Sequence, residues 1–151
     1  MPADDITAKA QTLVRRPRED VFNAFIDPQI MSKFWFVRKD QGLREGDTVI
    51  WYVGDAPEAF EIEVRVKSIK QPSRITIEWG HGGQFTTVNW ALEAQSSDVT
   101  RLVIEERGFK GSHDEIVSQA LDSTCGFNQV VIALKALLEH DATINVVADH
   151  V

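Results

Sequence analysis

The sequence predicts a single α+β domain in which a long C-terminal amphipathic helix packs across a twisted antiparallel sheet. Two patterns carry this prediction. Between residues 47 and 107, apolar and polar residues alternate in short runs, which is typical of strands with one buried and one solvated face. From residue 116 to about residue 139, apolar residues recur at helical spacing instead. A chain of 151 residues suits one domain with one core.

The N-terminal part is predicted to hold one strand and two short helices. Residues 6–14 have the composition of a strand, and Pro17 then opens a helix at a position where its missing N–H costs nothing. The Asp27-Pro28 pair ends that helix, because the residue before a proline avoids the helical region. A second short helix is expected over residues 29–35.

Three consecutive aromatic residues, Phe34, Trp35 and Phe36, close this region. Successive side chains on a helix or a strand cannot all point into one core. We therefore expect at least one of the three to meet solvent, a ligand or a partner.

The central region is predicted to be a meander of antiparallel strands. The links between the alternating runs are short and rich in Gly, Pro, Ser and Asp, which are turn formers. Short links between neighbouring strands imply hairpins rather than helical crossovers. The predicted strands cover residues 48–53, 60–67, 75–79, 87–93 and 101–105.

The final helix has the clearest signals. Ser112 and Glu115 have the spacing of a capping box, which fixes the start of the helix. At about 1.5 Å per residue the helix reaches about 40 Å. Gly126 interrupts it, and we expect a bend or a close approach to the sheet there. Residues 141–151 form a tail with enough apolar side chains to dock on the domain.

Charge and cysteine content exclude several classes of partner. The net charge of -7 argues against nucleic acid and against an anionic membrane, both of which select basic surfaces. Cys125 is the only cysteine, so a reducing compartment is expected. The first residues lack the features of a secretory signal, and no apolar run approaches the ~20 residues that span a bilayer. We expect a cytoplasmic protein.

Several segments resemble the START-like, or SRPBCC, superfamily, and within it the family similar to the activator of the heat-shock-protein-90 ATPase. The segment RPREDVFNAF at residues 16–25 looks like the first helix of that family, and ITIEW at residues 75–79 like its central strand. TRLVI at residues 100–104 resembles its last strand, and residues 126–139 its final helix, where tryptophan is commoner at the position of Phe127.

The resemblance implies a helix-grip fold: a curved antiparallel sheet of six or seven strands, wrapped on the C-terminal helix, with two short helices after the first strand. Members are described as small-molecule binders, cyclases or dehydratases, or co-chaperone domains. A curved sheet on one helix leaves room for a cavity. The residues expected to line it are Trp51, Phe60, Ile62, Trp79, Trp90, Glu106, Phe127, Val131 and Leu134.

Two residues are weak candidates for chemistry. Glu106 continues an inward-facing series on its strand, so it could act as a general acid or base at the cavity mouth. The alternative is that it pairs with Arg107 or another surface cation. His81 lies in the glycine loop from Gly80 to Gly83, where it could transfer protons or be a solvated turn residue.

Other reactive residues have simpler interpretations. Tryptophans can line a cavity or fill a core, and the core is favoured for Trp90, whereas both roles stay open for Trp79. Cys125 has no histidine near it in sequence and is expected to be a small buried apolar residue. The histidines lack the spacing of a zinc site, and no phosphate-loop motif is found, so neither a metal nor a cofactor is expected.

Three functions follow from these observations. The leading hypothesis is a protein that binds a small apolar or aromatic molecule in the cavity. The second is a cyclase, dehydratase or hydrolase that uses Glu106 or His81. The third is a co-chaperone-like interaction module, for which Phe34, Trp35 and Phe36 offer the candidate surface. A homodimer formed through an exposed strand edge is compatible with all three.

Overall fold

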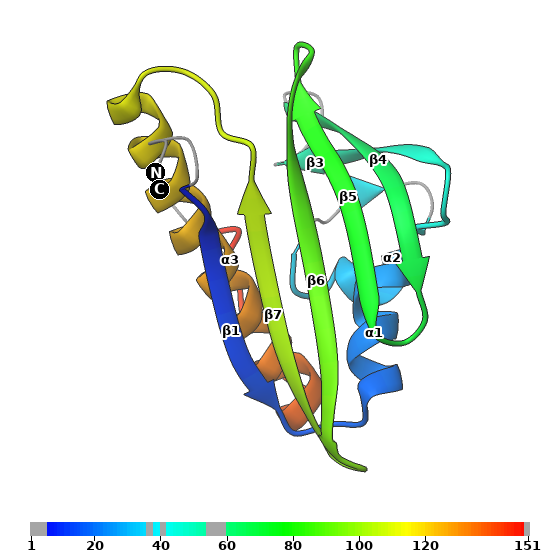
Figure 1. Ribbon diagram of the computed structural model, residues 1–151. Helices are drawn as coiled ribbons and strands as arrows, with labels where there is room; N and C mark the ends of the chain where they lie inside the picture. The colour runs from blue at the N-terminus through cyan, green and yellow to red at the C-terminus, as the bar shows by residue number, and fades with distance from the viewer. Residues whose placement is uncertain (1–5, 36–37, 40–41, 54–59, 150–151) are drawn as a thin grey trace.

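A computed structural model describes residues 6–35, 38–39, 42–53 and 60–149, and these residues form one antiparallel sheet with three helices (Figure 1). The order of strands across the sheet is β1-β7-β6-β5-β4-β3-β2. The strands are β1 (Ala8–Val14), β2 (Arg38–Lys39), β3 (Thr48–Val53), β4 (Phe60–Lys70), β5 (Arg74–His81), β6 (Gln84–Ser96) and β7 (Val99–Arg107). The helices are α1 (Arg18–Ile26), α2 (Pro28–Met31) and α3 (His113–His140).

The predicted α+β architecture is confirmed, including the antiparallel meander from β3 to β7. The sequence missed the two-residue strand β2, which is too short to show a period. The second helix is also shorter than the predicted residues 29–35. It ends at Met31, and the chain continues in a turn in which the backbone N–H groups of Phe34 and Trp35 donate to the Met31 carbonyl at 3.1 and 2.9 Å. This turn carries both aromatic side chains into the core.

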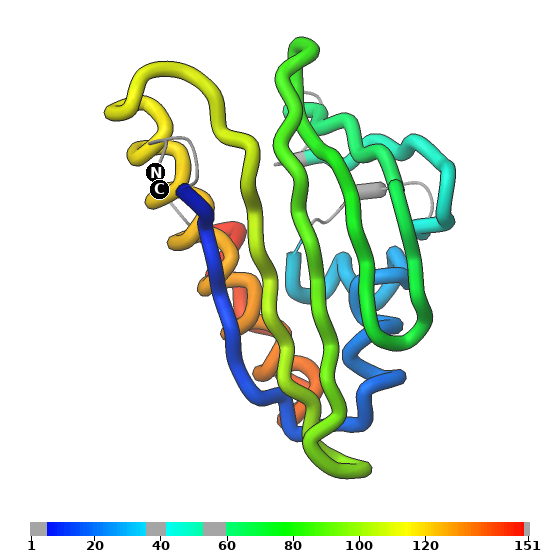
Figure 2. Tube along the Cα trace, viewed as in Figure 1, coloured from blue at the N-terminus to red at the C-terminus, as the bar shows by residue number. Residues whose placement is uncertain are grey.

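The helices cover one face of the sheet, and α3 runs along β1 and β7 at its edge (Figure 1). Its predicted capping box is present. The Ser112 hydroxyl accepts from the backbone N–H of Glu115 at 3.2 Å, and the Glu115 carboxylate accepts from the backbone N–H of Ser112 at 3.2 Å. The hydrogen bonds from the Ser112 backbone and hydroxyl lower the pKa of Glu115. Figure 2 shows that α3 begins at the end of the sheet where β5 and β6 form their hairpin.

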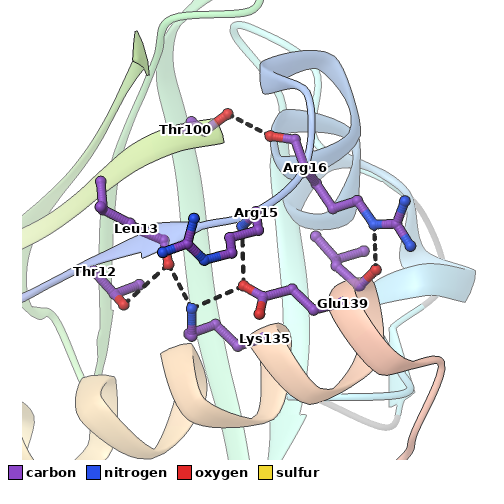
Figure 3. Close-up of polar contacts among 8 residues, drawn as sticks. Thr12, Leu13, Arg15, Arg16, Thr100, Lys135 and Glu139 are labelled. Carbon is purple, nitrogen blue, oxygen red and sulfur yellow. Dashed lines mark hydrogen bonds and ion pairs between the residues drawn. The ribbon is translucent and has the colours of Figure 1, made fainter. Parts of the chain in front are cut away.

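The C-terminal end of α3 is hydrogen-bonded to the end of β1 and to the two residues that follow it (Figure 3). The Glu139 carboxylate accepts from the backbone N–H of Arg15 at 2.9 Å and from Lys135 Nζ at 2.8 Å. Lys135 Nζ also donates to the Leu13 carbonyl at 2.6 Å, at the end of β1. The Arg16 side chain donates to a backbone carbonyl in the last turn of α3. These contacts hold α3 in its place along the sheet.

Two expectations about α3 are wrong: the close approach to the sheet at Gly126, which was one of two alternatives for that residue, and the burial of Cys125. A side chain added at Gly126 would meet nothing within 4 Å, so the helix and sheet do not approach closely there. The contact is made one residue later by Phe127, which is 2% exposed. Cys125 is exposed rather than buried. Both errors have one cause: residues 125 and 126 lie outside the stripe that faces the sheet, whereas Phe127, Val131 and Leu134 lie on it.

The core between sheet and helices is filled largely by aromatic side chains. Trp51 and Trp90 are fully buried, and the Trp35 ring lies 5.4 Å from that of Trp51 and 6.2 Å from that of Trp90. Phe34 and Trp35 are themselves 3% and 8% exposed, so neither is the predicted surface residue. Phe36 lies outside the described residues. In the tail, residues 146 and 147 pack against this core.

Candidate functional site

Glu106 is a buried carboxylate on the inner face of β7. The strand alternates, so Leu102, Ile104 and Glu106 point inward, and Glu106 is 3% exposed. The indole Nε1–H of Trp79 donates to Oε2 of Glu106 at 2.8 Å, and the hydroxyl of Thr86 donates to the same oxygen. Oε1 is also buried, but it has no hydrogen-bond partner among the residues that the structure describes.

The neighbouring charges on β7 point to the other side of the sheet. Arg107 pairs with Glu105 at 3.3 Å, and Lys9 pairs with Glu105 at 3.7 Å. Glu106 makes no ion pair within the described part of the chain, so the pairing with Arg107 considered from the sequence is not observed. Strand alternation explains this, because adjacent residues on a strand face opposite sides.

A pocket of about 250 Å³ opens beside Glu106. It lies at the end of the sheet that carries the β5–β6 hairpin, and its lining comes from the start of β4, this hairpin, the end of β7 with the loop after it, and α3. Among the residues predicted to line a cavity, Phe60, Ile62, Trp79 and Glu106 line this pocket, as does His81. The other five are not part of its lining: Trp51, Trp90, Phe127, Val131 and Leu134 pack in the core.

The sequence did not identify the residues at the ends of the elements. Thr86 and Phe85 line the pocket from β6, and Lys110 and Gln119 line it from the loop after β7 and from α3. The predicted strand began at residue 87, so it left out Phe85 and Thr86, which β6 includes. A signal was available for Thr86, because it continues the inward series of Val88 two residues further on.

The pocket has an aromatic wall. The Trp79 ring is stacked on Phe127, with ring centroids 5.8 Å apart and an angle of 13° between the planes. Trp79 is therefore held from the core side while it lines the pocket. Phe60 and His81 also line the pocket, and their ring centroids lie 4.4 Å apart. Phe60 is 50% exposed. His81 Nδ1 lies 3.2 Å from the Glu61 carbonyl oxygen, which fixes the ring at the rim.

The glycines of the β5–β6 hairpin are required by its geometry. Gly82 and Gly83 have φ angles of 63° and 82°, a combination that matches a two-residue hairpin turn and that side chains disfavour. A Cβ at Gly80 would lie 1.8 Å from the Gln84 carbonyl oxygen. The glycine run thus builds a tight turn that positions His81, rather than a phosphate-binding loop.

A second hollow lies on the opposite, outer face of the sheet, across β1, β5, β6 and β7. It is lined by four cations and one carboxylate, Glu105. Three of these cations, Lys9, Arg101 and Arg107, form ion pairs with glutamates at 3.3 to 3.7 Å. The hollow is therefore a solvated, charge-paired sheet face, unlike the pocket at Glu106.

Two kinds of feature are not found in the part of the chain that the structure describes. Within the described ranges, no group of three or more His, Cys, Asp or Glu side chains could hold a metal ion. None of the helices that the structure describes is both long and apolar enough to cross a membrane.

The strand order, the paired short helices and the long final helix define a helix-grip fold. The model of one protein family, described as activator of Hsp90 ATPase homolog 1-like protein, matches residues 15–139. The chain therefore belongs to this family, in agreement with the resemblance seen in the sequence. A search of curated proteins finds no match.

Solved structures share the fold at low sequence identity. Protein SSP2350 from Staphylococcus saprophyticus is 24% identical, with a TM-score of 0.76 over 92% of this chain and 96% of that chain. DynU16, from the dynemicin biosynthetic locus, is 19% identical with a TM-score of 0.77, over 92% of this chain and 49% of that chain. PFC0360w, an HSP90 activator from Plasmodium falciparum, is 16% identical with a TM-score of 0.68, over 89% of this chain and 96% of that chain.

Proposed function

We propose that this protein binds a small apolar or aromatic molecule in the pocket beside Glu106. The observation that supports this most directly is the wall of the pocket, in which Phe60 is 50% exposed next to Trp79 and Ile62. Exposed aromatic surface inside a concavity is what a ring-bearing ligand would cover. The buried carboxylate of Glu106 adds a polar group that can orient such a ligand.

The size of the pocket limits the ligand. The volume of the pocket is about 250 Å³. It lies just below the range of about 300–1,000 Å³ that holds drug-sized compounds. The ligand is therefore a molecule of one or two rings, rather than a long lipid.

A titration with Prodan, a neutral fluorescent dye built on a two-ring naphthalene, tests this function. We expect saturable binding of one dye per chain, with an affinity about tenfold lower in Phe60→Ala because a ring of the wall is lost. Leu121→Ala is the matched control. Leu121 is a large apolar residue that is 66% exposed on α3 and does not line the pocket. Dye binding that fails to saturate, or that falls equally in both variants, would contradict the proposal.

An enzymatic function is the second candidate, because Glu106 and His81 line the same pocket. Two titratable groups beside one site could act as general acid and general base on a bound molecule. Turnover of a ligand found by the dye assay, lost in both Glu106→Gln and His81→Gln, would support it. A bound ligand that is recovered unchanged would leave binding as the function.

A co-chaperone function is the third candidate, supported by the family and by the likeness to the Plasmodium HSP90 activator. Phe34 and Trp35 do not offer a surface for it, since both are buried. Stimulation of the ATPase of an Hsp90-type chaperone by the purified protein would support this function. The homodimer and the cytoplasmic location stay predictions from the sequence.

A further inference from the structure

Oε1 of Glu106 is a buried carboxylate oxygen without a hydrogen-bond partner in the described ranges, and Glu106 lines the pocket. We propose that the ligand of this pocket is an organic amine, whose protonated N–H group donates a hydrogen bond to this oxygen. The inference rests on the proposed binding function, and it specifies the chemical class of the ligand.

The donor requirement follows from how the two oxygens of Glu106 are used. Oε2 accepts from the Trp79 indole and from the Thr86 hydroxyl, so its acceptor role is fixed by two neighbouring strands. Oε1 receives neither of these donors. A buried acceptor that lacks a partner is costly, and the cost is greatest for a charged group. A ligand that brings a donor to Oε1 removes this cost when it binds.

The charges around the pocket favour a cationic donor over a neutral one. Charge-assisted hydrogen bonds are roughly twice as strong as neutral ones. The rings of Trp79 and Phe60 line the same pocket, and aromatic rings attract cations. The net charge of -7 on the chain also raises the local concentration of cations rather than anions.

One residue opposes a cation. Lys110 lines the pocket, but it is exposed, so solvent and salt screen its charge. Glu106 is buried, so its charge is screened much less. The carboxylate therefore dominates the choice of ligand, and Lys110 reduces the affinity for an amine without reversing the preference.

Four probes of similar size separate the contributions of the N–H donor, the positive charge and the apolar ring system of the ligand to binding. Naphthylmethylamine has both the charge and the N–H donors, and its N-trimethyl derivative has the charge alone. Methylnaphthalene has neither, and naphthoate has the opposite charge. Measured by calorimetry on the wild-type protein, the amine should bind about tenfold tighter or more than each of the other three.

Three variants test whether the preference for the amine depends on the charge of Glu106. Glu106→Gln should weaken binding of the amine by about tenfold or more and leave methylnaphthalene within about twofold. Glu105→Gln is the matched control, because it removes the same charge one residue away on the outer face and should not change amine binding. Lys110→Gln should strengthen amine binding by about twofold to fivefold. Thermal unfolding of each variant checks that it is folded.

The outcomes distinguish this inference from the proposed function. If the four probes bind equally, or if naphthoate binds best, the pocket binds apolar rings but the amine inference is wrong. If the trimethyl derivative matches the amine, charge rather than a donor is recognised, and the hydrogen bond to Oε1 is wrong. If no probe binds to the wild-type protein, both the proposed function and the amine inference fail. The probe series on the wild-type protein decides this even if Glu106→Gln does not fold.

Discussion

Trp79 and Glu106 are joined by a hydrogen bond of 2.8 Å, although strand β6 lies between their strands β5 and β7. Neighbouring strands lie about 4.8 Å apart, so the two side chains meet across roughly 10 Å of backbone. The residue opposite Trp79 on β6 is Thr86, whose short side chain leaves room for this bridge. Its hydroxyl donates to the same carboxylate oxygen, so three strands are connected beside the pocket.

Replacing Thr86 with valine tests this connection. We expect the free energy of unfolding to fall by about 1–3 kcal/mol, because valine keeps the branched shape but removes a donor to a buried carboxyl group. Thr87→Val is the matched control, since Thr87 lines the hollow on the outer face, and it should change stability by less than about 0.5 kcal/mol. Urea denaturation measures both. An equal loss in the two variants would show that the Thr86 hydroxyl contributes nothing specific.

The inward position of Glu106 could be predicted because strand alternation is a local property. Leu102 and Ile104 set the phase of β7, and Glu106 follows two residues on. Its partner Trp79 was predicted to face inward by the same logic. That the two residues bond to each other depends on the register of three strands, which no local pattern specifies.

The division between core and pocket could not be predicted from alternation. Trp51 and Phe60 both lie on inward positions, but Trp51 is fully buried and Phe60 is half exposed. The difference is the position of each residue within its own strand. Trp51 packs against Trp35, which the turn after α2 carries into the core, whereas Phe60 is the first residue of β4, at the end of the sheet where the pocket lies. Such end effects require the lengths and curvature of neighbouring strands, which the period of a sequence does not encode.

Two glycines are expected to respond to alanine in opposite directions. Gly126→Ala should raise the free energy of unfolding by about 0.5–1 kcal/mol, because glycine is a poor helix former and a Cβ there meets nothing within 4 Å. Gly80→Ala should lower it by about 1–3 kcal/mol, since its Cβ would overlap the Gln84 carbonyl oxygen. Thermal unfolding measures both. A destabilised Gly126→Ala would show that α3 needs its glycine for packing.

The start of α3 depends on its capping box. Ser112→Ala should cost about 1 kcal/mol of stability, because the backbone N–H of Glu115 loses its acceptor. Ser118→Ala provides the control. Ser118 is exposed within the same helix, where alanine is the better helix former, so stability should stay the same or rise slightly. Equal losses in both variants, measured by chemical denaturation, would contradict a role for the cap.

The hydrogen bonds of Glu139, which help to hold α3 against the end of β1, should depend on pH. Burial raises the pKa of the Glu139 carboxyl, but the hydrogen bonds from Lys135 and the Arg15 backbone and the charges of Lys135 and His140 outweigh it. The pKa therefore lies below its ordinary value of 4.5. A carboxyl group whose pKa is lower in the folded state stabilises the fold fully above the unfolded value. That stability is lost as the pH falls through the folded value.

Glu139→Gln removes the charge and keeps the size of the side chain. Near pH ~7 we expect the variant to be less stable than the wild type by about 1–2 kcal/mol, because Lys135 and Arg15 lose a charged acceptor. This difference should persist down to the ordinary pKa of 4.5 and shrink below it. Glu93→Gln, which breaks the exposed pair with Arg101, should cost no more than about 1 kcal/mol near pH ~7. Denaturant titrations across this pH range measure the difference, and a loss in Glu139→Gln that stays constant below 4.5 would contradict the role of the ionised carboxylate.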